Sequence, residues 1–505
     1  MNLNEMLFPS LVANASKVMA IDNEKELTGG DLFKGALCIS TTLQKRMTRD
    51  DLHVGIVMPN SIPYIASFLG ILLSQKVSVP LNPILTPHEI LLLLEGSDTS
   101  IALSLSPLRE KMDAVASQSG GAVTVIYVDE LLNSLSTQSV APPVTEKGLH
   151  NLIESLQNVH EDTPACILHT SGTQGKNKGV VLTHNNLASN NFSIDERLGA
   201  VPEDVFLSVL PWFHSFGLMT TLLLPMYHGA KIVIIRTLNP GEILHTIERE
   251  RVSVICTVPA LYGFMEQYLT HHTVDISSLR VCASGGDSIS ALLEETLRKR
   301  YGAKLLVGYG LTETSPVVSL NLLTHQVPGT VGPPLDNVEV EIWDEDGNAL
   351  SRNTPGEIMV RGPNVMREYY KDPAATAAAL TPENWLRTGD FGMLDEKGFL
   401  SITGRKKDII IRKGENIYPR EIEEALIEHP AVAEVVVVGI KDERFSEFPK
   451  AFVMLHDGKK IEEKDLRQLL KGRLASFKWP REFEFVNDFP RNALGKVQKH
   501  KLVSR

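Results

Sequence analysis

Short apolar runs of strand length alternate with segments of helical spacing along the first third of the chain. One helix start is explicit, because Thr86 can cap it, Pro87 takes its first position and Glu89 its third. This alternation predicts βαβ units and a largely parallel sheet, which is an α/β fold. The expected strands are Val18–Ile21, Val54–Met58, Val77–Pro80, Val123–Val128 and Ala165–Leu168, and the expected helices are Asp31–Met47, Ile62–Leu73 and Pro87–Gly96.

The segment Leu131–Glu161 differs from these elements, because it is polar and rich in Ser, Gln and Asn. It is interpreted as an excursion over the surface. A further helix is expected after Thr183.

The character of the sequence changes after Arg405. A small α+β unit of about one hundred residues is expected there, which is a typical domain size. Its expected elements are strands at Ile409–Ile411, Val435–Val438, Ala451–Leu455 and Phe483–Val486, an amphipathic helix opened by Pro419, and a helix at Ile461–Leu474. A chain of 505 residues is long enough for several domains. We therefore expect a large N-terminal α/β domain of several subdomains over residues 1–403 and a small C-terminal α+β domain over residues 404–505.

Composition excludes some classes of protein. The net charge of −11 argues against a nucleic-acid-binding surface. The amino terminus lacks the features of a secretory signal, and the longest apolar runs are too short to span a bilayer. The four cysteines are widely spaced among apolar neighbours, which predicts buried free thiols and fits a reducing cytoplasm. They are Cys38, Cys166, Cys256 and Cys282.

A loop rich in glycine, hydroxyl and lysine residues follows the apolar run Ala165–Leu168. Glycines let backbone N–H groups turn toward a ligand, hydroxyls add donors and lysines add positive charge, so the loop suits a polyphosphate. Its spacing is not that of Walker A. The alternative is a polar surface loop. The candidate nucleotide-binding residues here are Thr170, Ser171, Gly172, Thr173, Gln174, Gly175, Lys176 and Lys178.

Two glycine-rich segments lie farther along the chain, at Ala283–Asp287 and Gly308–Thr314. In the second, glycines flank Tyr309, so that a flat base can lie against the ring and the backbone. Thr312 and Glu313 then offer the oxygen ligands that Mg²⁺ shares with phosphates. The alternative is a strand-to-turn junction with a solvated Glu313.

Three further residues carry chemistry only in context. Asp390 in Trp385–Asp390 can accept two hydrogen bonds from ribose hydroxyls, although Asp after Gly is also a common turn residue. His214 lies among aromatic residues in Pro211–Gly217, where a core or surface histidine is the commoner interpretation. Lys496 follows a glycine near the chain end, where lysines are normally solvated.

Taken in order, these segments resemble the motifs of the adenylate-forming superfamily, which includes acyl-CoA synthetases, luciferases and peptide-synthetase adenylation domains. The loop resembles the family pattern Thr-Ser-Gly-Thr-Thr-Gly-x-Pro-Lys-Gly, with Gln174 in place of the usual Thr and Asn177 in place of the usual Pro. The resemblance covers the chain from about Gly55 to Lys496, and its general character is most like that of bacterial fatty-acid–CoA ligases.

The resemblance implies a role for each matching residue. Tyr309 would stack on adenine, Thr312 would touch the α-phosphate and Glu313 would ligate Mg²⁺. Gly285 and Gly308 would line the nucleotide site, and Asp390 and Arg405 would bind the ribose. His214 would act as an aromatic gate at the substrate carboxylate, and Lys496 would bridge that carboxylate and ATP. The small domain would be mobile, with a pivot at Lys407 and a CoA-facing side near Gly414.

The function implied is an ATP-dependent acyl-CoA synthetase of the cytoplasm, which converts a medium- or long-chain fatty acid to acyl-AMP and then to acyl-CoA. Its partners would be ATP, Mg²⁺, CoA and a small carboxylate; Phe213 and His214 replace the acid that would hold an amino group, which argues against an amino-acid substrate. Alternatives are a ligase that loads a separate carrier protein, a CoA ligase for an aryl or other carboxylate, a luciferase-like oxygenase, and a non-catalytic sensor, which only Gln174 and Asn177 support. The sequence leaves a homodimer and peripheral membrane contact open.

Overall fold

The structure is a computed structural model, and it describes most of the chain. The described residues are 2–23, 25–48, 51–137, 159–171, 177–405, 408–412, 415–442, 446–471, 473–491 and 497–503.

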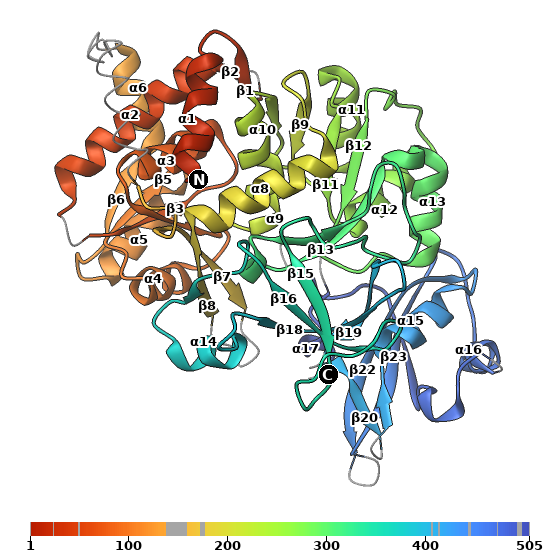
Figure 1. The fold of residues 1–505 in the computed structure, drawn as a ribbon. Coiled ribbons are helices and arrows are strands. Elements are labelled where there is room, and N and C mark those ends of the chain that lie inside the picture. Colours follow the sequence, from red (N-terminus) through yellow and green to blue (C-terminus); the bar gives the residue numbers. More distant parts are fainter. Residues whose placement is uncertain are drawn as a thin grey trace.

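A seven-stranded sheet forms from the N-terminal part of the chain and is largely parallel (Figure 1). Its strand order is β17-β8-β7-β4-β3-β5-β6, and only β8 and β17 enter through antiparallel pairs. The strands are β3 (His53–Val57), β4 (Val77–Leu81), β5 (Ile101–Ser104), β6 (Thr124–Tyr127), β7 (Pro164–Ser171), β8 (Asn177–Thr183) and β17 (Glu368–Tyr369).

An eight-stranded sheet follows, in the order β14-β13-β12-β11-β9-β10-β1-β2. It is parallel except for the pairs that β2 and β14 make at its two edges. The strands are β1 (Val18–Asp22), β2 (Lys25–Thr28), β9 (Val205–Ser208), β10 (Lys231–Ile234), β11 (Val254–Thr257), β12 (Val281–Ser284), β13 (Leu305–Gly310) and β14 (Val317–Leu320).

Helices fill the space between these two sheets and cover their outer faces (Figure 1). Between the sheets, α3 (Ile62–Leu73) packs on β3, β4 and β1, and α8 (His184–Leu198) packs on β8 and β14. The helix α3 is apolar on all sides, which suits a position between two sheets. The remaining helices of this part include α1 (Leu3–Ala13), α2 (Gly29–Arg46), α4 (Pro87–Gly96), α5 (Arg109–Gln118), α6 (Val128–Thr137), α9 (Ser215–Leu218), α10 (Leu224–His228), α11 (Pro240–Glu250), α12 (Pro259–Leu269) and α13 (Ala291–Tyr301).

The outer layers have hydrophobic cores of their own. Side chains of α4 and α5 pack on the seven-stranded sheet, and side chains of α11, α12 and α13 pack on the eight-stranded sheet. The order of layers is therefore helix, sheet, helix, sheet, helix. In parallel sheets, ligands bind outside the carboxyl ends of the strands. A ligand site is therefore expected near the ends of β7, β12 and β13.

A four-stranded antiparallel sheet lies below these layers in the view of Figure 1, in the order β15-β16-β18-β19. Its strands are β15 (Glu339–Trp343), β16 (Gly356–Arg361), β18 (Leu386–Leu394) and β19 (Leu400–Arg405), and α14 (Pro373–Ala379) precedes β18.

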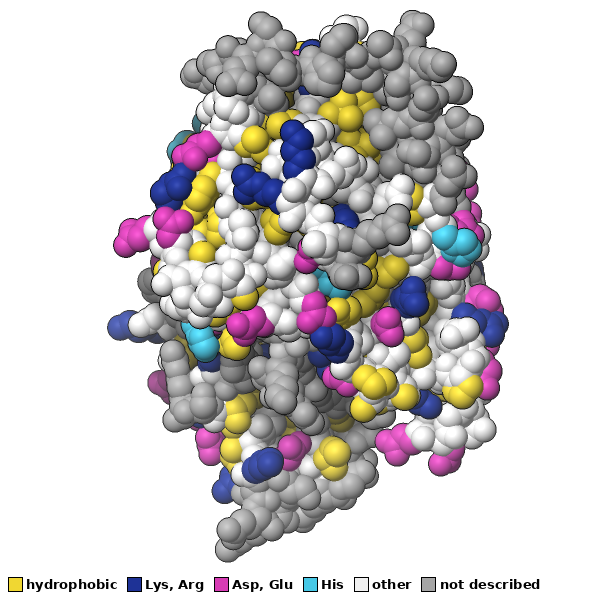
Figure 2. Space-filling view, turned by 90° about the vertical axis from the view of Figure 1, so that its left-hand side faces the viewer, with side chains coloured by type: hydrophobic (Ala, Val, Ile, Leu, Met, Phe, Trp, Pro, Cys, Tyr) yellow, Lys and Arg dark blue, Asp and Glu magenta, His cyan; other side chains and the backbone are white. Residues whose placement is uncertain are grey.

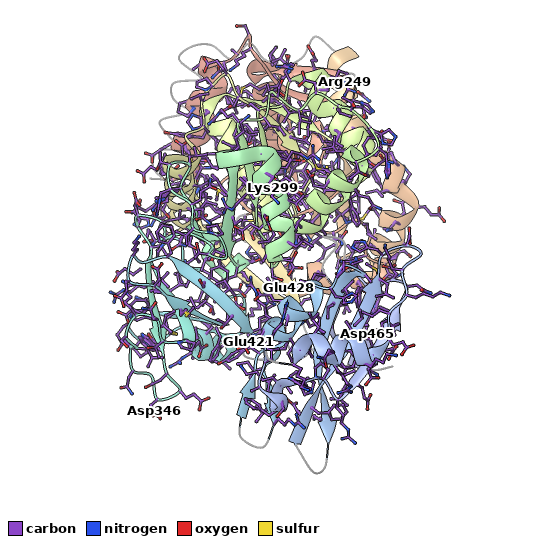
Figure 3. The ribbon with its side chains drawn as sticks, turned by 90° about the vertical axis from the view of Figure 1, so that its right-hand side faces the viewer. Arg249, Lys299, Asp346, Glu421, Glu428 and Asp465 are labelled. Atoms are coloured by element: carbon purple, nitrogen blue, oxygen red, sulfur yellow. The ribbon has the colours of Figure 1, made fainter. Side chains whose placement is uncertain are left out.

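The C-terminal segment forms a five-stranded sheet with helices on it. Figure 3 shows this unit with Glu421 on its first helix and Asp465 on its second, beside the sheet that carries Asp346. The Arg420 guanidinium donates to the Ile402 carbonyl at 2.7 Å, which joins the unit to the four-stranded sheet. The elements are β20 (Ile410–Arg412), β21 (Glu415–Ile417), α15 (Pro419–Ile427), β22 (Val432–Asp442), β23 (Ser446–Leu455), α16 (Glu463–Leu470), β24 (Glu482–Val486) and α17 (His500–Val503).

The expected α/β class is confirmed, and α3 and α4 have the expected bounds. The expected helix after Thr183 is present as α8, and β8, for which no strand was expected, precedes it and pairs with β7 as a hairpin. Two local expectations were wrong. Residues 131–137 belong to α6, which packs on α2 and α3, so this part of the expected surface excursion is helical. The helix α16 is shorter than expected, since it begins after its cap at Glu462.

The surface carries charges of both signs. On the face shown in Figure 2, acidic and basic side chains are interspersed with hydrophobic ones. Within the described ranges, no helix is long and apolar enough to cross a membrane.

Candidate active site

Asp390 lies between two side chains that come from different sheets. The Tyr309 hydroxyl donates to Asp390 Oδ2 at 2.7 Å, and Arg405 Nε lies 3.1 Å from Asp390 Oδ1. Asp390 on β18 is the direct cross-strand neighbour of Arg405 on β19, whereas Tyr309 lies near the end of β13. Both oxygens of a buried carboxylate are thus engaged, and the network ties the eight-stranded sheet to the four-stranded sheet.

The backbone around Asp390 is held by its own sequence. Gly389 has a φ of 71°, which favours glycine because it has no Cβ. The Asp390 N–H donates to the Thr388 hydroxyl at 3.0 Å, and that hydroxyl donates to the Ile358 carbonyl at 2.8 Å. The Gly389 N–H donates to the buried Glu357 carboxylate at 3.3 Å. The turn that presents Asp390 is therefore fixed before any ligand binds.

Tyr309 and Arg405 keep their protonation states near neutral pH. Burial and the neighbouring Asp390 raise the pKa of Tyr309 well above its ordinary value, so its hydroxyl remains a donor. Burial lowers the pKa of Arg405, but Asp390 and other neighbouring groups outweigh burial, so the net shift is upward.

Glu313 lies in a short 3₁₀ helix, Thr312–Thr314, directly after β13. The Tyr369 hydroxyl donates to Glu313 Oε1 at 2.8 Å, and Lys178 Nζ lies 4.5 Å from the centroid of the Tyr369 ring. Tyr369 also pairs with Val180 across β17 and β8. The short strand β17 therefore lies between the strand that leaves the glycine-rich loop and the segment that carries Glu313.

The described part of the glycine-rich loop is its base. Thr170 pairs with Lys178 and Ser171 with Asn177 in the hairpin of β7 and β8. Farther along, the Thr183 hydroxyl accepts from the Asn186 N–H at 3.1 Å and caps α8. The predicted residues Gly172, Thr173, Gln174, Gly175 and Lys176 lie outside the described residues.

The segment with His214 meets the same region from another side. The Ser215 hydroxyl lies 3.3 Å from the Thr312 hydroxyl, which places this segment beside Glu313. Phe216 faces Gly285, because a Cβ built on Gly285 would lie 3.6 Å from Phe216 Cζ and 3.4 Å from the Gly308 carbonyl oxygen. The end of β12 thus meets an aromatic side chain at Gly285, close to the Gly308 carbonyl of β13.

Burial keeps two histidines of this region neutral. Burial lowers the pKa of His214 and that of His169 to about 4. The His214 ring packs against Phe213 with 4.7 Å between ring centroids. His169 Nδ1 is buried without a hydrogen-bond partner among the described residues. At neutral pH, neither imidazole adds positive charge to the site.

One carboxylate in this region has the chemistry that Mg²⁺ requires. Within the described residues, no group of three or more His, Cys, Asp or Glu residues could hold a metal ion by itself. Mg²⁺ that accompanies phosphates needs only one or two carboxylates, since the phosphates supply further oxygens. Glu313 Oε1 accepts from Tyr369, Oε2 has no hydrogen bond or ion pair within the described residues, and Thr312 precedes Glu313 in the chain. These residues fit Mg²⁺ bound together with a polyphosphate.

The structure brings most of the predicted residues to one region around the end of β13. They are Thr170, Lys178, His214, Gly285, Gly308, Tyr309, Thr312, Glu313, Asp390 and Arg405. The predicted residues Lys407, Gly414 and Lys496 lie outside the described ranges. Sequence reasoning missed Tyr369 and Glu357, because neither lies in a segment with a recognisable pattern.

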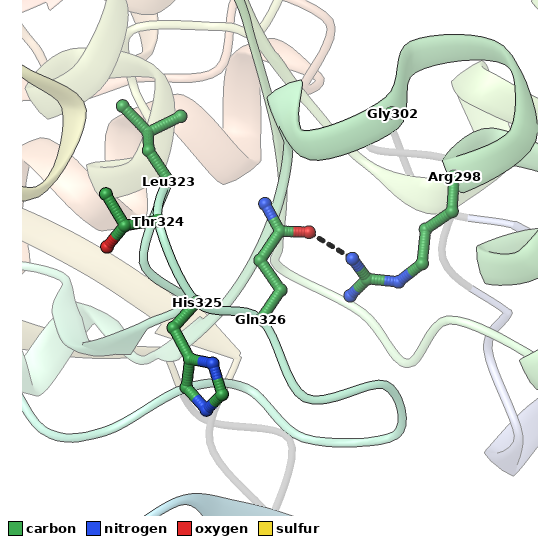
Figure 4. A pocket seen from close by; sticks show the side chains of 6 residues that line it. All are labelled: Arg298, Gly302, Leu323, Thr324, His325 and Gln326. Carbon is green, nitrogen blue, oxygen red and sulfur yellow. Dashed lines mark hydrogen bonds between the residues drawn. The ribbon is translucent and has the colours of Figure 1, made fainter.

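A separate surface hollow lies beside α13 (Figure 4). Arg298, Gly302 and residues 323–326 line it, and the Arg298 guanidinium donates to the Gln326 side chain. None of the predicted site residues contributes to it.

Two family models match the chain. The model of the AMP-binding enzyme family matches residues 10–370, and that of the AMP-binding enzyme C-terminal domain matches residues 421–496. Among characterised relatives, a long-chain-fatty-acid–CoA ligase of Bacillus subtilis is 32% identical over 95% of this chain and 90% of the relative. A 4-coumarate–CoA ligase of Narcissus pseudonarcissus is 31% identical over 100% of this chain and 93% of the relative.

Solved structures share the fold over almost the whole chain. ATP-bound MatB of Rhodopseudomonas palustris has a TM-score of 0.90 and 29% identity, covering 100% of this chain and 99% of that protein. The o-succinylbenzoate–CoA synthetase of Bacillus subtilis, in complex with ATP and a magnesium ion, has a TM-score of 0.84 and 30% identity, covering 99% of each chain.

Proposed function

The chain belongs to the AMP-binding enzyme family, and we propose that this AMP-forming acid–thiol ligase activates a medium- or long-chain fatty acid and transfers the acyl group to CoA. The nucleotide part of the proposal rests on one observation, the Tyr309–Asp390–Arg405 network near the end of β13. Its carboxylate can still accept ribose hydroxyls, because two oxygens offer about four acceptor sites.

Each described residue has a proposed task in the first step. A carboxylate oxygen attacks the α-phosphorus of ATP, the bond to pyrophosphate breaks, and acyl-AMP forms. Asp390 and Arg405 hold the ribose, and Tyr309 lies against the base. Lys178 offsets phosphate charge, and Thr312 donates to the α-phosphate. Glu313 would hold Mg²⁺, which when bound supplies charge neutralisation between the carboxylate and the polyphosphate.

The fatty acid is supported by the chemistry of the segment Pro211–Gly217. This segment contains no Asp, Glu, Lys or Arg, and it presents Phe213, Phe216 and a neutral His214. An uncharged acyl chain suits such surroundings, because a second charge on the acid would need a partner. The similarity to a long-chain-fatty-acid–CoA ligase points the same way.

A second candidate is a CoA ligase for an aryl carboxylate. The similarity to a 4-coumarate–CoA ligase favours it, and Phe216 would offer an aromatic acid a ring to pack against. A ligase that loads a separate carrier protein would share every nucleotide contact.

The second step is assigned to the small domain. In it, the CoA thiol attacks the acyl carbonyl and AMP leaves. We propose that residues 404–505 rotate against residues 1–403 about Lys407, so that Lys496 serves adenylation and the side near Gly414 serves thioester formation. These three residues lie outside the described ranges, and their motifs alone support the assignment.

Pyrophosphate release tests the function. Fatty acids of graded chain length, aryl carboxylates and short dicarboxylates are offered with ATP and Mg²⁺, with and without CoA. The proposal expects release to be fastest with medium or long fatty acids and acyl-CoA to form when CoA is added. A preference for aryl acids would replace the first candidate with the second. Acyl-AMP that is never transferred to CoA would exclude both.

Lys496 provides a test of the division between the two steps. Lys496→Ala should reduce pyrophosphate release by at least about a hundredfold, within the range for a group that stabilises transition-state charge. It should spare thioester formation from supplied acyl-AMP. Lys501→Ala, which changes an exposed lysine near the same chain end, is the control. Equal loss in both half-reactions would reject the assignment.

A further inference from the structure

We infer that Tyr369 is a positioning residue, which sets the distance between the metal-binding carboxylate of Glu313 and the phosphate-facing amine of Lys178. The inference deepens the proposed function, since it rests on the proposed roles of Glu313 and Lys178. No sequence motif pointed to Tyr369, and its place is evident only from the pairing of β17 with β8.

The position of Tyr369 is fixed from both sides of β17. The Arg367 N–H donates to the Val181 carbonyl at 3.0 Å, and the Tyr370 N–H donates to the Gly179 carbonyl at 2.7 Å. The Met366 N–H donates to the Glu313 carbonyl at 2.8 Å. The backbone that flanks the strand is therefore bonded both to β8 and to the segment that carries Glu313.

The Tyr369 side chain contacts the same two segments, the one that carries Glu313 and the strand β8. Tyr369 exposes 8% of its surface. Its hydroxyl donates to Glu313 Oε1 at 2.8 Å, while Lys178 Nζ lies 4.5 Å from its ring centroid. A ring face attracts a cation, and a phenol donates to a carboxylate, so one side chain binds the two opposite charges without neutralising either.

The hydrogen bond from Tyr369 engages one oxygen of the Glu313 carboxylate. Because the bond occupies Oε1, it limits rotation of the carboxylate and leaves Oε2 as the oxygen that would bind Mg²⁺. The ring in turn keeps the Lys178 amine near the Tyr369 side chain that holds Glu313. The expected result is a correctly spaced pair of charges for ATP with its Mg²⁺.

The next residue provides an internal control. The Tyr370 hydroxyl also donates to a carboxylate, Asp98 Oδ2, at 2.7 Å. Its ring also has a lysine near it, since Lys371 Nζ lies 5.8 Å from the centroid. Asp98 lies beyond the end of α4, among none of the site residues. Tyr369 and Tyr370 thus make the same kinds of contact, one inside the site and one outside.

Three variants separate the two proposed effects of Tyr369. Tyr369→Phe removes the hydroxyl and keeps the ring, Tyr369→Leu removes both, and Tyr370→Phe removes the control hydroxyl. ATP is titrated into each protein by calorimetry without acid or CoA, first in EDTA and then at graded Mg²⁺ concentrations. Thermal unfolding of each variant shows whether it is folded, and Tyr369→Phe carries the test if Tyr369→Leu is not.

Loss of a hydrogen bond to a charged group predicts that Tyr369→Phe needs about tenfold more Mg²⁺ for tight ATP binding. Its affinity for ATP in EDTA should equal that of the parent, whereas Tyr369→Leu should lose affinity there as well. Tyr370→Phe should match the parent in both conditions, and thioester formation from supplied acyl-AMP should be unchanged in Tyr369→Phe.

The inference fails if Tyr369→Phe has the Mg²⁺ dependence of the parent, or if it loses the same factor in EDTA as in Mg²⁺. It also fails if Tyr370→Phe shows an equal shift. These results are separate from failure of the proposed function, which would appear as a parent protein that binds ATP with Mg²⁺ but releases no pyrophosphate with any carboxylate.

Discussion

The proposed nucleotide end and the proposed acyl end of the site are built in different ways. At the nucleotide end, Asp390 has a hydrogen bond from Tyr309, an ion pair with Arg405 and a turn fixed through Thr388. At the acyl end, the His214 imidazole has no hydrogen bond among the described residues, and Phe216 is placed by packing against glycines.

The difference suits what each end has to recognise. A ribose and a phosphate are the same in every turnover, and directional polar contacts bind them in one orientation. An acyl chain offers few polar groups, so its recognition depends on shape and on apolar surface. Packing contacts can change with little effect on the polar network, which is consistent with relatives named for different acids sharing one fold.

The largest effect is expected at the nucleotide end. Asp390→Ala leaves Tyr309 and Arg405 without their partner and removes the carboxylate for the ribose. Loss of a hydrogen bond to a charged group costs about 1.5–3 kcal/mol, so ATP affinity should fall at least about tenfold. Calorimetric titration of ATP measures this, with Asp346→Ala on an exposed turn of the same sheet as the control (Figure 3). If a folded Asp390→Ala protein bound ATP as tightly as the parent, Asp390 would not hold the ribose, and the comparison between the two ends of the site would fail.

A smaller change in substrate recognition is expected at the acyl end. Phe216→Ala removes a ring that faces Gly285 and opens space for the acid. Because one methylene in an apolar pocket is worth about 1–3 kcal/mol, the preference between neighbouring chain lengths should change about tenfold. The measurement is kcat/KM for pyrophosphate release over a series of fatty acids, with the half-exposed Phe264→Ala as the control. An unchanged preference would show that Phe216 does not face the acid.

The same contrast explains what the sequence could predict. Tyr309, Asp390 and Arg405 lie in short motifs whose residue types state their chemistry, and the structure brings them into contact. Tyr369 could not be found in this way, because its role comes from the pairing of β17 with a strand far away in the sequence. Local pattern reveals a residue whose neighbours in sequence share its task, but not one whose partners are assembled by the fold.

The prediction of helices and strands was limited in the same way, because it too depended on local sequence signals. The helix α3 was predicted with its bounds because its apolar character and flanking residues are local signals. The strand β8 was missed, although Val180–Leu182 is rich in branched side chains, because it lies between the glycine-rich loop and the helix that begins after Thr183, and its pairing with β7 leaves no local signal. The end of α16 was placed too late, at Leu474, since the helix ends at Leu470 with Lys471 as its C-cap.

The smallest expected effect is on how the stability of the protein depends on pH, through His214 at the acyl end. The pKa of His214 is lowered from 6.5 to about 4, so the unfolded chain takes up this proton at a higher pH than the folded protein does. The stability that neutral His214 contributes is therefore present above pH 6.5 and is lost as the pH falls through 4.

His214→Phe keeps an aromatic ring without a titrating group. Its free energy of unfolding should fall less steeply than that of the parent between pH 6.5 and 4, and some decline should remain because His169 and His184 are shifted in the same way. Urea unfolding at a series of pH values measures this, with the exposed His271→Phe as the control. A slope equal to that of the parent would contradict the burial of a neutral His214.

The central claim is that the two ends act independently, and the double variant Asp390→Ala/Phe216→Ala tests it most directly. Steady-state pyrophosphate release gives KM for ATP and KM for the fatty acid in the parent, both single variants and the double variant. Substitutions without shared partners are expected to add in free energy. The account predicts that the double variant has the ATP KM of Asp390→Ala and the acid KM of Phe216→Ala. Single variants that each shift both constants by similar factors, with non-additive values in the double variant, would contradict it.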